Sequence, residues 1–151
     1  MSEVFASIVV GTDGSDTAAK AVRHAIGLAL ELGSGLKIVS AYEPASDQSL
    51  RGEQTQAPRD LQWALSPRAD VMALLEQAQA EAADAGVDAV ETFARQGDAA
   101  DAILDVAEEQ DADLIIVGNK GMTGAKRFLL GSVPNKVSHH APCSVLIVRT
   151  S

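Results

Sequence analysis

The sequence predicts an α/β domain of three layers, in which helices cover both faces of a five-stranded parallel sheet. Short apolar runs of strand length alternate with segments of helical period, through five strands and four helices. Alternation of this kind is typical of a parallel sheet with right-handed helical crossovers and helices on both faces. A length of 151 residues suits a single domain with its own core, so we expect one domain over residues 1–151.

The first part of the chain contains two predicted strands and the helix between them. Residues 7–12 are apolar and β-branched between turn residues, which predicts a strand buried on both faces. A helix follows to residue 32, with Ser15 as its N-cap and Gly33 at its end. A second apolar run predicts a strand over residues 36–42.

Residues 43–66 interrupt this alternation. The segment is polar, contains Pro44, Gly52 and Pro58, and has neither a helical nor an alternating period. It is too long for an ordinary connection in a compact domain. We expect a flexible surface insert, which is either disordered or docked in part through Trp63 as a lid or a partner site.

The second part of the chain returns to regular alternation. The predicted elements are a helix from Pro67 to Gly86, a strand over 89–94, a helix capped by Asp98, a strand over 114–117, a short helix over 133–140 and a strand over 144–148. The strand over 89–94 is less apolar than the strands over 7–12 and 114–117, so we expect it near an edge of the sheet.

Composition excludes several classes of function. The net charge of −9 argues against a nucleic-acid partner. No apolar run approaches the ~20 residues of a membrane-spanning helix, and the N-terminus lacks the features of a signal peptide. Cys143 is the single cysteine, so no intrachain disulfide can form, which agrees with a reducing compartment. We therefore expect a cytoplasmic protein with no membrane or nucleic-acid partner.

The charges are distributed unevenly along the chain. All 21 acidic residues precede residue 114, whereas residues 114–151 contain five Lys or Arg and no Asp or Glu. This segment also holds a glycine-rich stretch, 118–131, between a predicted strand and a helix with Ser132 at its N-cap position. Glycines allow close approach of main-chain N–H groups, and a helix N-terminus favours negative charge. We therefore predict an anion site here, with phosphate as the natural ligand.

The spacing of these glycines distinguishes the loop from other phosphate loops. It fits neither the Walker A sequence nor the dinucleotide fingerprint. Gly118, Gly121, Gly131 and Ser132 form the spacing G-x2-G-x9-G-S, which resembles the ATP-binding motif of the universal stress protein family. The likeness extends to residues 9–15 and 141–148, and so frames nearly the whole chain.

The resemblance implies a Rossmann-like nucleotide-binding domain with the sheet order 3-2-1-4-5. In that order the direction of winding reverses between the first and fourth strands, and ligands of open α/β sheets bind at such a reversal. The expected nucleotide contacts are Gly11, Thr12, Asp13, Ala41, Gly118, Asn119, Lys120, Gly121, Gly131, Ser132 and Val133.

Asp13 and Lys120 each have alternative interpretations. The Asp13 carboxylate could bind ribose, the adenine amino group or Mg on the phosphates, or could simply cap its own turn. The resemblance implies an adenosine contact at Asp13 and a main-chain contact with adenine at Ala41. Lys120 could reach a phosphate or remain solvated. No metal site held by the protein alone is expected, and the three histidines are interpreted as structural or solvated.

The leading functional hypothesis is a stress-response or signalling protein that binds ATP, or a related adenine nucleotide, as a module or switch. No nucleophile and base can be paired, so no catalytic residue is expected. Three alternatives remain open: a slow ATPase or adenylyl-transfer enzyme, a cyclic AMP-binding protein with the same cleft, and an interaction module without nucleotide. The apolar run over 144–149 would be an exposed sheet edge, so we also expect a homodimer paired through it.

Overall fold

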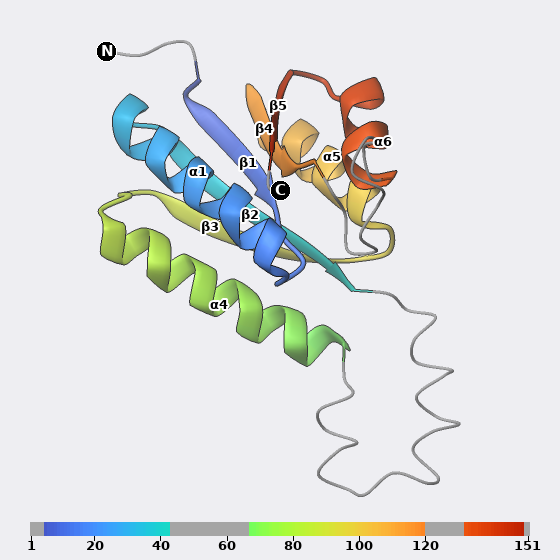
Figure 1. Cartoon of the computed structure of the whole chain (residues 1–151), viewed down its shortest axis with the longest axis horizontal. Coiled ribbons are helices and arrows are strands. Elements are labelled where there is room, and N and C mark those ends of the chain that lie inside the picture. Colours follow the sequence, from blue (N-terminus) through green and yellow to red (C-terminus); the bar gives the residue numbers. More distant parts are fainter. Residues whose placement is uncertain (1–4, 43–66, 120–131, 150–151) are drawn as a thin grey trace, which may run out of the picture.

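The computed structural model describes residues 5–42, 67–119 and 132–149, and these confirm the predicted α/β fold (Figure 1). The insert expected at 43–66 lies outside the described residues. In chain order the elements are β1 (Ser7–Gly11), α1 (Asp16–Leu32), β2 (Gly35–Tyr42), α4 (Pro67–Ala85), β3 (Val90–Gln96), α5 (Ala99–Glu109), β4 (Leu114–Gly118), α6 (Ser132–His140) and β5 (Ser144–Val148).

The five strands form one parallel sheet in the order β3-β2-β1-β4-β5, which confirms the predicted topology. β1 lies at the centre and pairs with β2 as far as Gly11↔Val39 and with β4 as far as Val10↔Ile116. The winding direction therefore reverses between β1 and β4, at the carboxyl end of the central strand.

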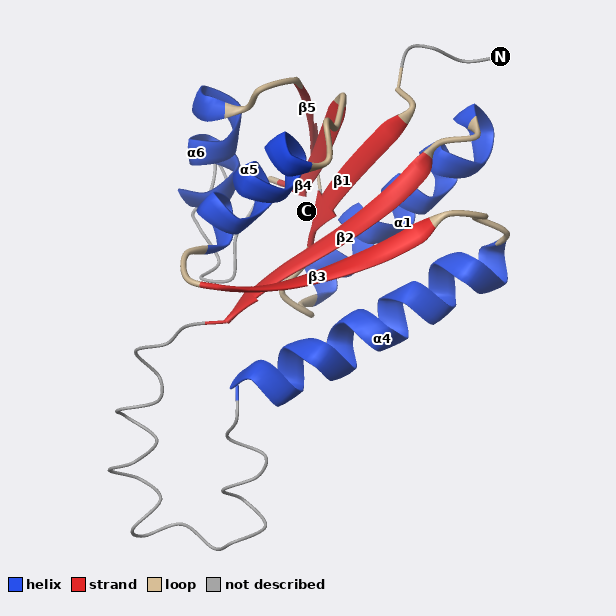
Figure 2. Cartoon of the chain, turned by 180° about the vertical axis from the view of Figure 1, so that it is seen from behind, coloured by secondary structure: helices blue, strands red, loops and turns tan. Residues whose placement is uncertain are grey.

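Helices cover both faces of the sheet and bury two separate apolar clusters. α1 and α4 pack on one face, while α5 and α6 lie side by side on the other, as the two opposite views show (Figures 1 and 2). The central strands contribute to both clusters, because Ile8 and Val10 face α1 whereas Val9 faces α5. Within the described residues, no helix is both long and apolar enough to cross a bilayer.

Local signals in the sequence account for most element boundaries. The Ser15 hydroxyl accepts a hydrogen bond from the N–H of Ala18 at 3.1 Å and caps α1. Gly33 ends α1 in the left-handed region at φ 68°. The Asp98 carboxylate caps α5 by accepting from the N–H of Asp101 at 3.1 Å.

Several boundaries differ from prediction. β1 ends at Gly11 rather than at residue 12, and β4 extends to Gly118 rather than to residue 117. β2 begins one residue earlier, at Gly35, and β3 covers Val90–Gln96 rather than 89–94. Arg95 and Gln96 belong to the strand because β2 pairs with β3 as far as Tyr42↔Gln96, a constraint that local composition does not contain. α6 begins at Ser132 itself, so the structure does not bear out Ser132 as the residue that precedes the helix.

Gly27 gives a test of helix energetics within this fold. It lies in the middle of α1 on the exposed face, and a Cβ added there would meet nothing within 4 Å. We expect Gly27→Ala to raise the free energy of unfolding by about 0.5–1 kcal/mol, because alanine loses less backbone entropy in a helix. Urea denaturation measures this change. Gly33→Ala is the matched control and should lower the free energy of unfolding, since the φ of 68° at Gly33 disfavours a side chain. A Gly27→Ala protein less stable than the wild type would contradict the placement of Gly27 on the exposed face of α1.

Candidate functional site

A cleft opens where β1 ends and its two neighbours continue. The main-chain groups of successive strand residues point alternately to the two sides of the strand. The N–H of Thr12 donates to Val39 O at 2.9 Å, so Val39 faces β1. Ala41, two residues further along β2, therefore directs its N–H and C=O to the same side, beyond the last β1–β2 pair at Gly11↔Val39.

The same arrangement occurs on the other side of β1. The N–H of Asn119 donates to Val148 O at 2.9 Å, so Asn119 faces β5. Gly118 precedes it and therefore directs its main-chain groups toward β1, two residues past the last β1–β4 partner, Ile116. Main-chain groups of Ala41 and Gly118 thus flank one gap at the carboxyl end of the central strand.

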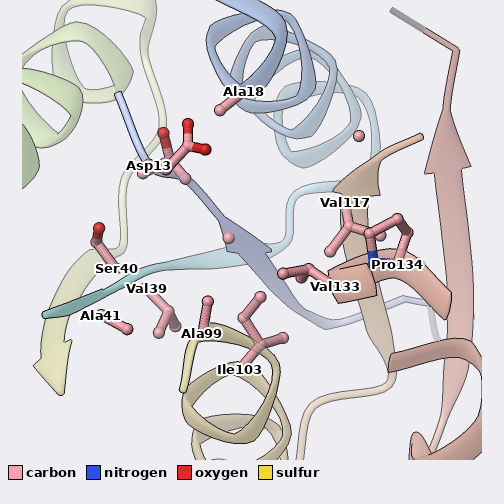
Figure 3. A pocket seen from close by; sticks show the side chains of 13 residues that line it. Asp13, Ala18, Val39, Ser40, Ala41, Ala99, Ile103, Val117, Val133 and Pro134 are labelled. Carbon is pink, nitrogen blue, oxygen red and sulfur yellow. The ribbon is translucent and has the colours of Figure 1, made fainter. Parts of the chain in front are cut away.

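The cleft is built from both sides of the sheet and from three helices (Figure 3). Its lining consists of Gly11, Thr12, Asp13, Ala18, Val39, Ser40, Ala41, Ala99, Ile103, Val117, Gly118, Val133 and Pro134. Six of the predicted contact residues are brought together in this lining: Gly11, Thr12, Asp13, Ala41, Gly118 and Val133.

The other predicted contacts are distributed differently. Asn119 and Ser132 are described but do not line the cleft, although each adjoins a residue that does. Lys120, Gly121 and Gly131 lie outside the described residues. The proposed phosphate loop is therefore represented in the structure by its two ends, at β4 and at α6.

An apolar wall, which the sequence did not reveal, completes the cleft on the α5 side. Ala99 and Ile103 come from the first turns of α5, and Figure 3 shows them opposite Val133 and Pro134 of α6. A Cβ on Gly11 would collide with the Ile103 side chain, so glycine at the end of β1 allows α5 to approach. The signal in the sequence that could have indicated this wall is the Asp98 N-cap, because it places Ala99 at the start of a helix.

Asp13 caps its own turn and also borders the cleft. Its Oδ1 accepts from the N–H of Ser15 at 2.8 Å, so the residue caps its own turn. Gly14 shares this turn at φ 84°, and its N–H donates to Thr12 Oγ1 at 3.2 Å. Within the described residues Oδ2 has no hydrogen-bond partner. The half-buried carboxylate lies at the cleft between the end of β1 and Ala18 of α1 (Figure 3).

Ser40 is a polar lining residue that sequence reasoning missed. It is only 4% exposed and belongs to β2 between Val39 and Ala41. Its hydroxyl makes no hydrogen bond within the described part of the chain. No buried side-chain oxygen of the described residues lacks a partner, so the Ser40 oxygen is accessible at the cleft and adds one further group that can donate or accept toward a ligand.

Lys136 links the two helices that form the apolar wall. Its Nζ lies 2.9 Å from Asp101 Oδ1 and 3.4 Å from Asp98 Oδ2. The hydrogen bond to Asp101, followed by the attraction of both carboxylates, raises the pKa of Lys136 above its ordinary value. The side chain is therefore an ammonium at neutral pH, held at the start of α5.

Other ionisable groups form no catalytic or metal constellation in the described ranges. No three His, Cys, Asp or Glu side chains gather there as a metal site requires. His24, His139 and His140 are exposed, as predicted. Cys143 is half-buried against the core, and this burial raises the pKa of its thiol.

Comparison with known proteins assigns the chain to a family. The universal stress protein family matches residues 5–149. The chain belongs to this family. Universal stress protein Rv1636 of Mycobacterium tuberculosis is 36% identical over 149 residues, which cover 97% of this chain and 98% of that protein. The family resemblance predicted from the glycine spacing is thus confirmed.

Solved structures of universal stress proteins share the fold. One of them, described as a complex with cAMP, is 34% identical, has a TM-score of 0.74, and is matched over 99% of this chain and 100% of its own. The universal stress protein UspA from Lactobacillus plantarum is 26% identical with a TM-score of 0.79, over 98% and 100% of the two chains. The fold and the order of the strands are therefore those of a universal stress protein domain.

Proposed function

We propose that this universal stress protein binds an adenine nucleotide in the cleft and acts as a stress-response or signalling module. The observation that carries the proposal is the meeting of three features at one place. An apolar wall, main-chain groups beyond the end of β1 and the first turn of α6 all border the same cleft. Such a site offers a surface for a base at one end and anion-binding geometry at the other.

The adenine end is formed by Ala41 and the apolar wall. The N–H and C=O of Ala41 lie side by side and face the cleft, so one residue offers a donor and an acceptor together. Adenine presents an acceptor, N1, next to a donor, the N6 amino group, and can pair with both. Val39, Ala99 and Ile103 supply apolar surface for the ring.

The phosphate end is assigned to Gly118 and the start of α6. In our proposal Gly121, Gly131 and Ser132 complete the phosphate loop, with Lys120 as a cationic contact. The N-terminus of α6 carries partial positive charge, and its first turn reaches the cleft through Val133 and Pro134. Asp13, between the two ends, accepts hydrogen bonds from the ribose; with ATP it could also approach a Mg ion on the phosphates.

Two adenine nucleotides compete as the physiological ligand. ATP is favoured by the G-x2-G-x9-G-S spacing, because a glycine loop of this length offers N–H groups to several phosphates. Cyclic AMP is the second candidate, because the 34% identical universal stress protein is described in complex with it. A cyclic phosphate leaves only the ribose 2′-hydroxyl free for Asp13, which distinguishes the two ligands chemically.

Calorimetric titration of the purified protein tests the proposal. ATP, AMP, cyclic AMP and adenosine should bind at one site and compete with one another, and GTP should bind more weakly because its base edge differs at N1 and at position 6. Extraction and mass spectrometry of any copurifying molecule identify which adenine nucleotide the cell supplies. Absence of binding by every adenine ligand at about 1 mM, a weak limit for a specific site, would refute the proposal.

The alternative of an ATPase is tested separately. The described residues contain no nucleophile paired with a base, so turnover of bound ATP should be very slow. Phosphate release under single-turnover conditions measures it. A rate in the ordinary enzyme range of about 1–1,000 s⁻¹ would favour the enzyme over the binding module.

We further propose that the protein is a homodimer through β5. Among the residues that the structure describes, β5 is an edge strand that pairs only with β4, and Leu146 is 38% exposed there. Val148 faces β4, so by alternation the N–H of Val145 points outward and that of Leu146 points into the sheet.

Val145→Pro should therefore convert the dimer to a monomer with the fold retained. Sedimentation velocity measures this, with Leu146→Pro as the control that damages the protein's own sheet. A wild-type monomer at micromolar concentration would disprove the proposal.

A further inference from the structure

The two helices that form the apolar wall of the cleft come from distant parts of the chain. α5 contributes Ala99 and Ile103, and α6 contributes Val133 and Pro134. α6 has only nine residues and packs more extensively against α5 than against β5. The relative position of these two helix starts therefore determines the shape of the apolar wall.

The Lys136 side chain connects these two helix starts. The Lys136 ammonium lies 2.9 Å from Asp101 Oδ1 and 3.4 Å from Asp98 Oδ2. The same Asp98 oxygen accepts the N–H of Asp101 at 3.1 Å and closes the first turn of α5. Lys136 lies one turn after Val133 on α6. The ion pair thus joins the first turn of α5 to the first turns of α6, the two helix starts that carry the apolar wall residues.

We propose that Lys136 is a positioning residue, which holds α6 against the start of α5 and so keeps the apolar wall of the nucleotide cleft closed. This inference rests on the proposed function, since it concerns the same site. Without the ion pair, α6 would also populate positions further from α5. The apparent affinity would then fall in proportion to the fraction of molecules with a closed wall.

A direct phosphate contact is the competing role for this ammonium. The two roles differ in their dependence on the ligand and on the carboxylates. A phosphate contact acts on ATP but leaves adenosine unaffected, and loss of Asp101 would free the ammonium for the phosphate. A positioning residue changes the affinity for ATP and for adenosine by the same factor, and loss of Asp101 weakens binding as much as loss of Lys136 does.

The experiment measures ATP and adenosine affinity by calorimetry in the full-length protein. Lys136→Met, which keeps the aliphatic length, and Asp101→Asn should each weaken both ligands by about two- to fivefold, the range expected for breaking exposed ion pairs. The double variant should bind both ligands about as tightly as the more impaired single variant does, because both changes break the same interaction. Lys136→Arg should restore most of the affinity, because it keeps the charge.

The Arg95–Glu109 pair provides a matched control. It joins β3 to the far end of α5, at 2.7 Å, and both side chains are partly exposed. Glu109→Gln should leave the affinity for adenosine unchanged. The inference is overturned if adenosine binding is unaffected in Lys136→Met, or if Asp101→Asn does not weaken it. Wild-type protein that binds neither ligand refutes the proposed function itself, and this inference with it.

Discussion

Ala99→Trp should abolish adenine-nucleotide binding while the sheet remains folded. Ala99 is the first residue of α5 and presents its methyl group to the cleft, where an indole would occupy the space assigned to the adenine ring (Figure 3). We expect affinity for ATP and adenosine to fall by about 100-fold or more, as when a central contact of an interface is lost. The fold should survive because the site opens to solvent, which calorimetry and circular dichroism together can establish.

Ala73→Trp is the control for this substitution. Ala73 lies on the exposed face of α4, outside the cleft lining, so the same increase in side-chain size should leave affinity unchanged. A folded Ala99→Trp protein that binds ATP as tightly as the wild type would show that the nucleotide does not occupy this cleft.

Asp13→Ala should weaken ATP and adenosine to a similar extent. The substitution removes the carboxylate acceptor at the centre of the cleft, and loss of a hydrogen bond to a charged group costs roughly 1.5–3 kcal/mol, or about ten- to hundredfold in affinity. Adenosine must be affected as well, because the proposed contact is with the ribose. If only ATP binding suffers, and only when Mg is present, the carboxylate contacts the metal instead.

Asp13→Asn separates the ribose contact from the turn. The asparagine Oδ1 can still accept from the N–H of Ser15, whereas its NH₂ group replaces the second carboxylate oxygen as a donor. We therefore expect the Asp13→Asn protein to bind ATP and adenosine more weakly than the wild type, although its turn is intact. Wild-type affinity in this variant would mean that Asp13 acts only through the turn.

Much of the fold could be predicted from local sequence signals. The alternation of apolar runs with helical periods, and caps such as Ser15 and Asp98, depend on neighbouring residues alone. The sheet order came from the family resemblance, and the structure agrees with it. The extension of β3 to Gln96 was missed, because it depends on a partner strand more than 50 positions away in the sequence.

The candidate site divides in the same way. Asp13 and Gly118 directly follow predicted strands and Gly11 lies near the end of one, so their place at the carboxyl edge followed from topology. Ala99 and Ser40 carry no chemical signature, and they border the cleft only because of how α5 and β2 pack. Ala41 was assigned by resemblance; the pairing of β1 with β2 now supplies a physical reason, since it leaves the Ala41 main chain facing the gap.

Mapping of amide chemical shifts during an ATP titration tests the central claim most directly. The account predicts that the largest changes occur at Thr12, Ala41, Gly118 and Val133, which come from four separate segments and meet only in the cleft. A shallow groove on the outer face of α1, around Gly27, provides an internal comparison and should be unaffected. Changes centred on that groove, or none at the cleft in a protein that binds ATP, would contradict the proposed site.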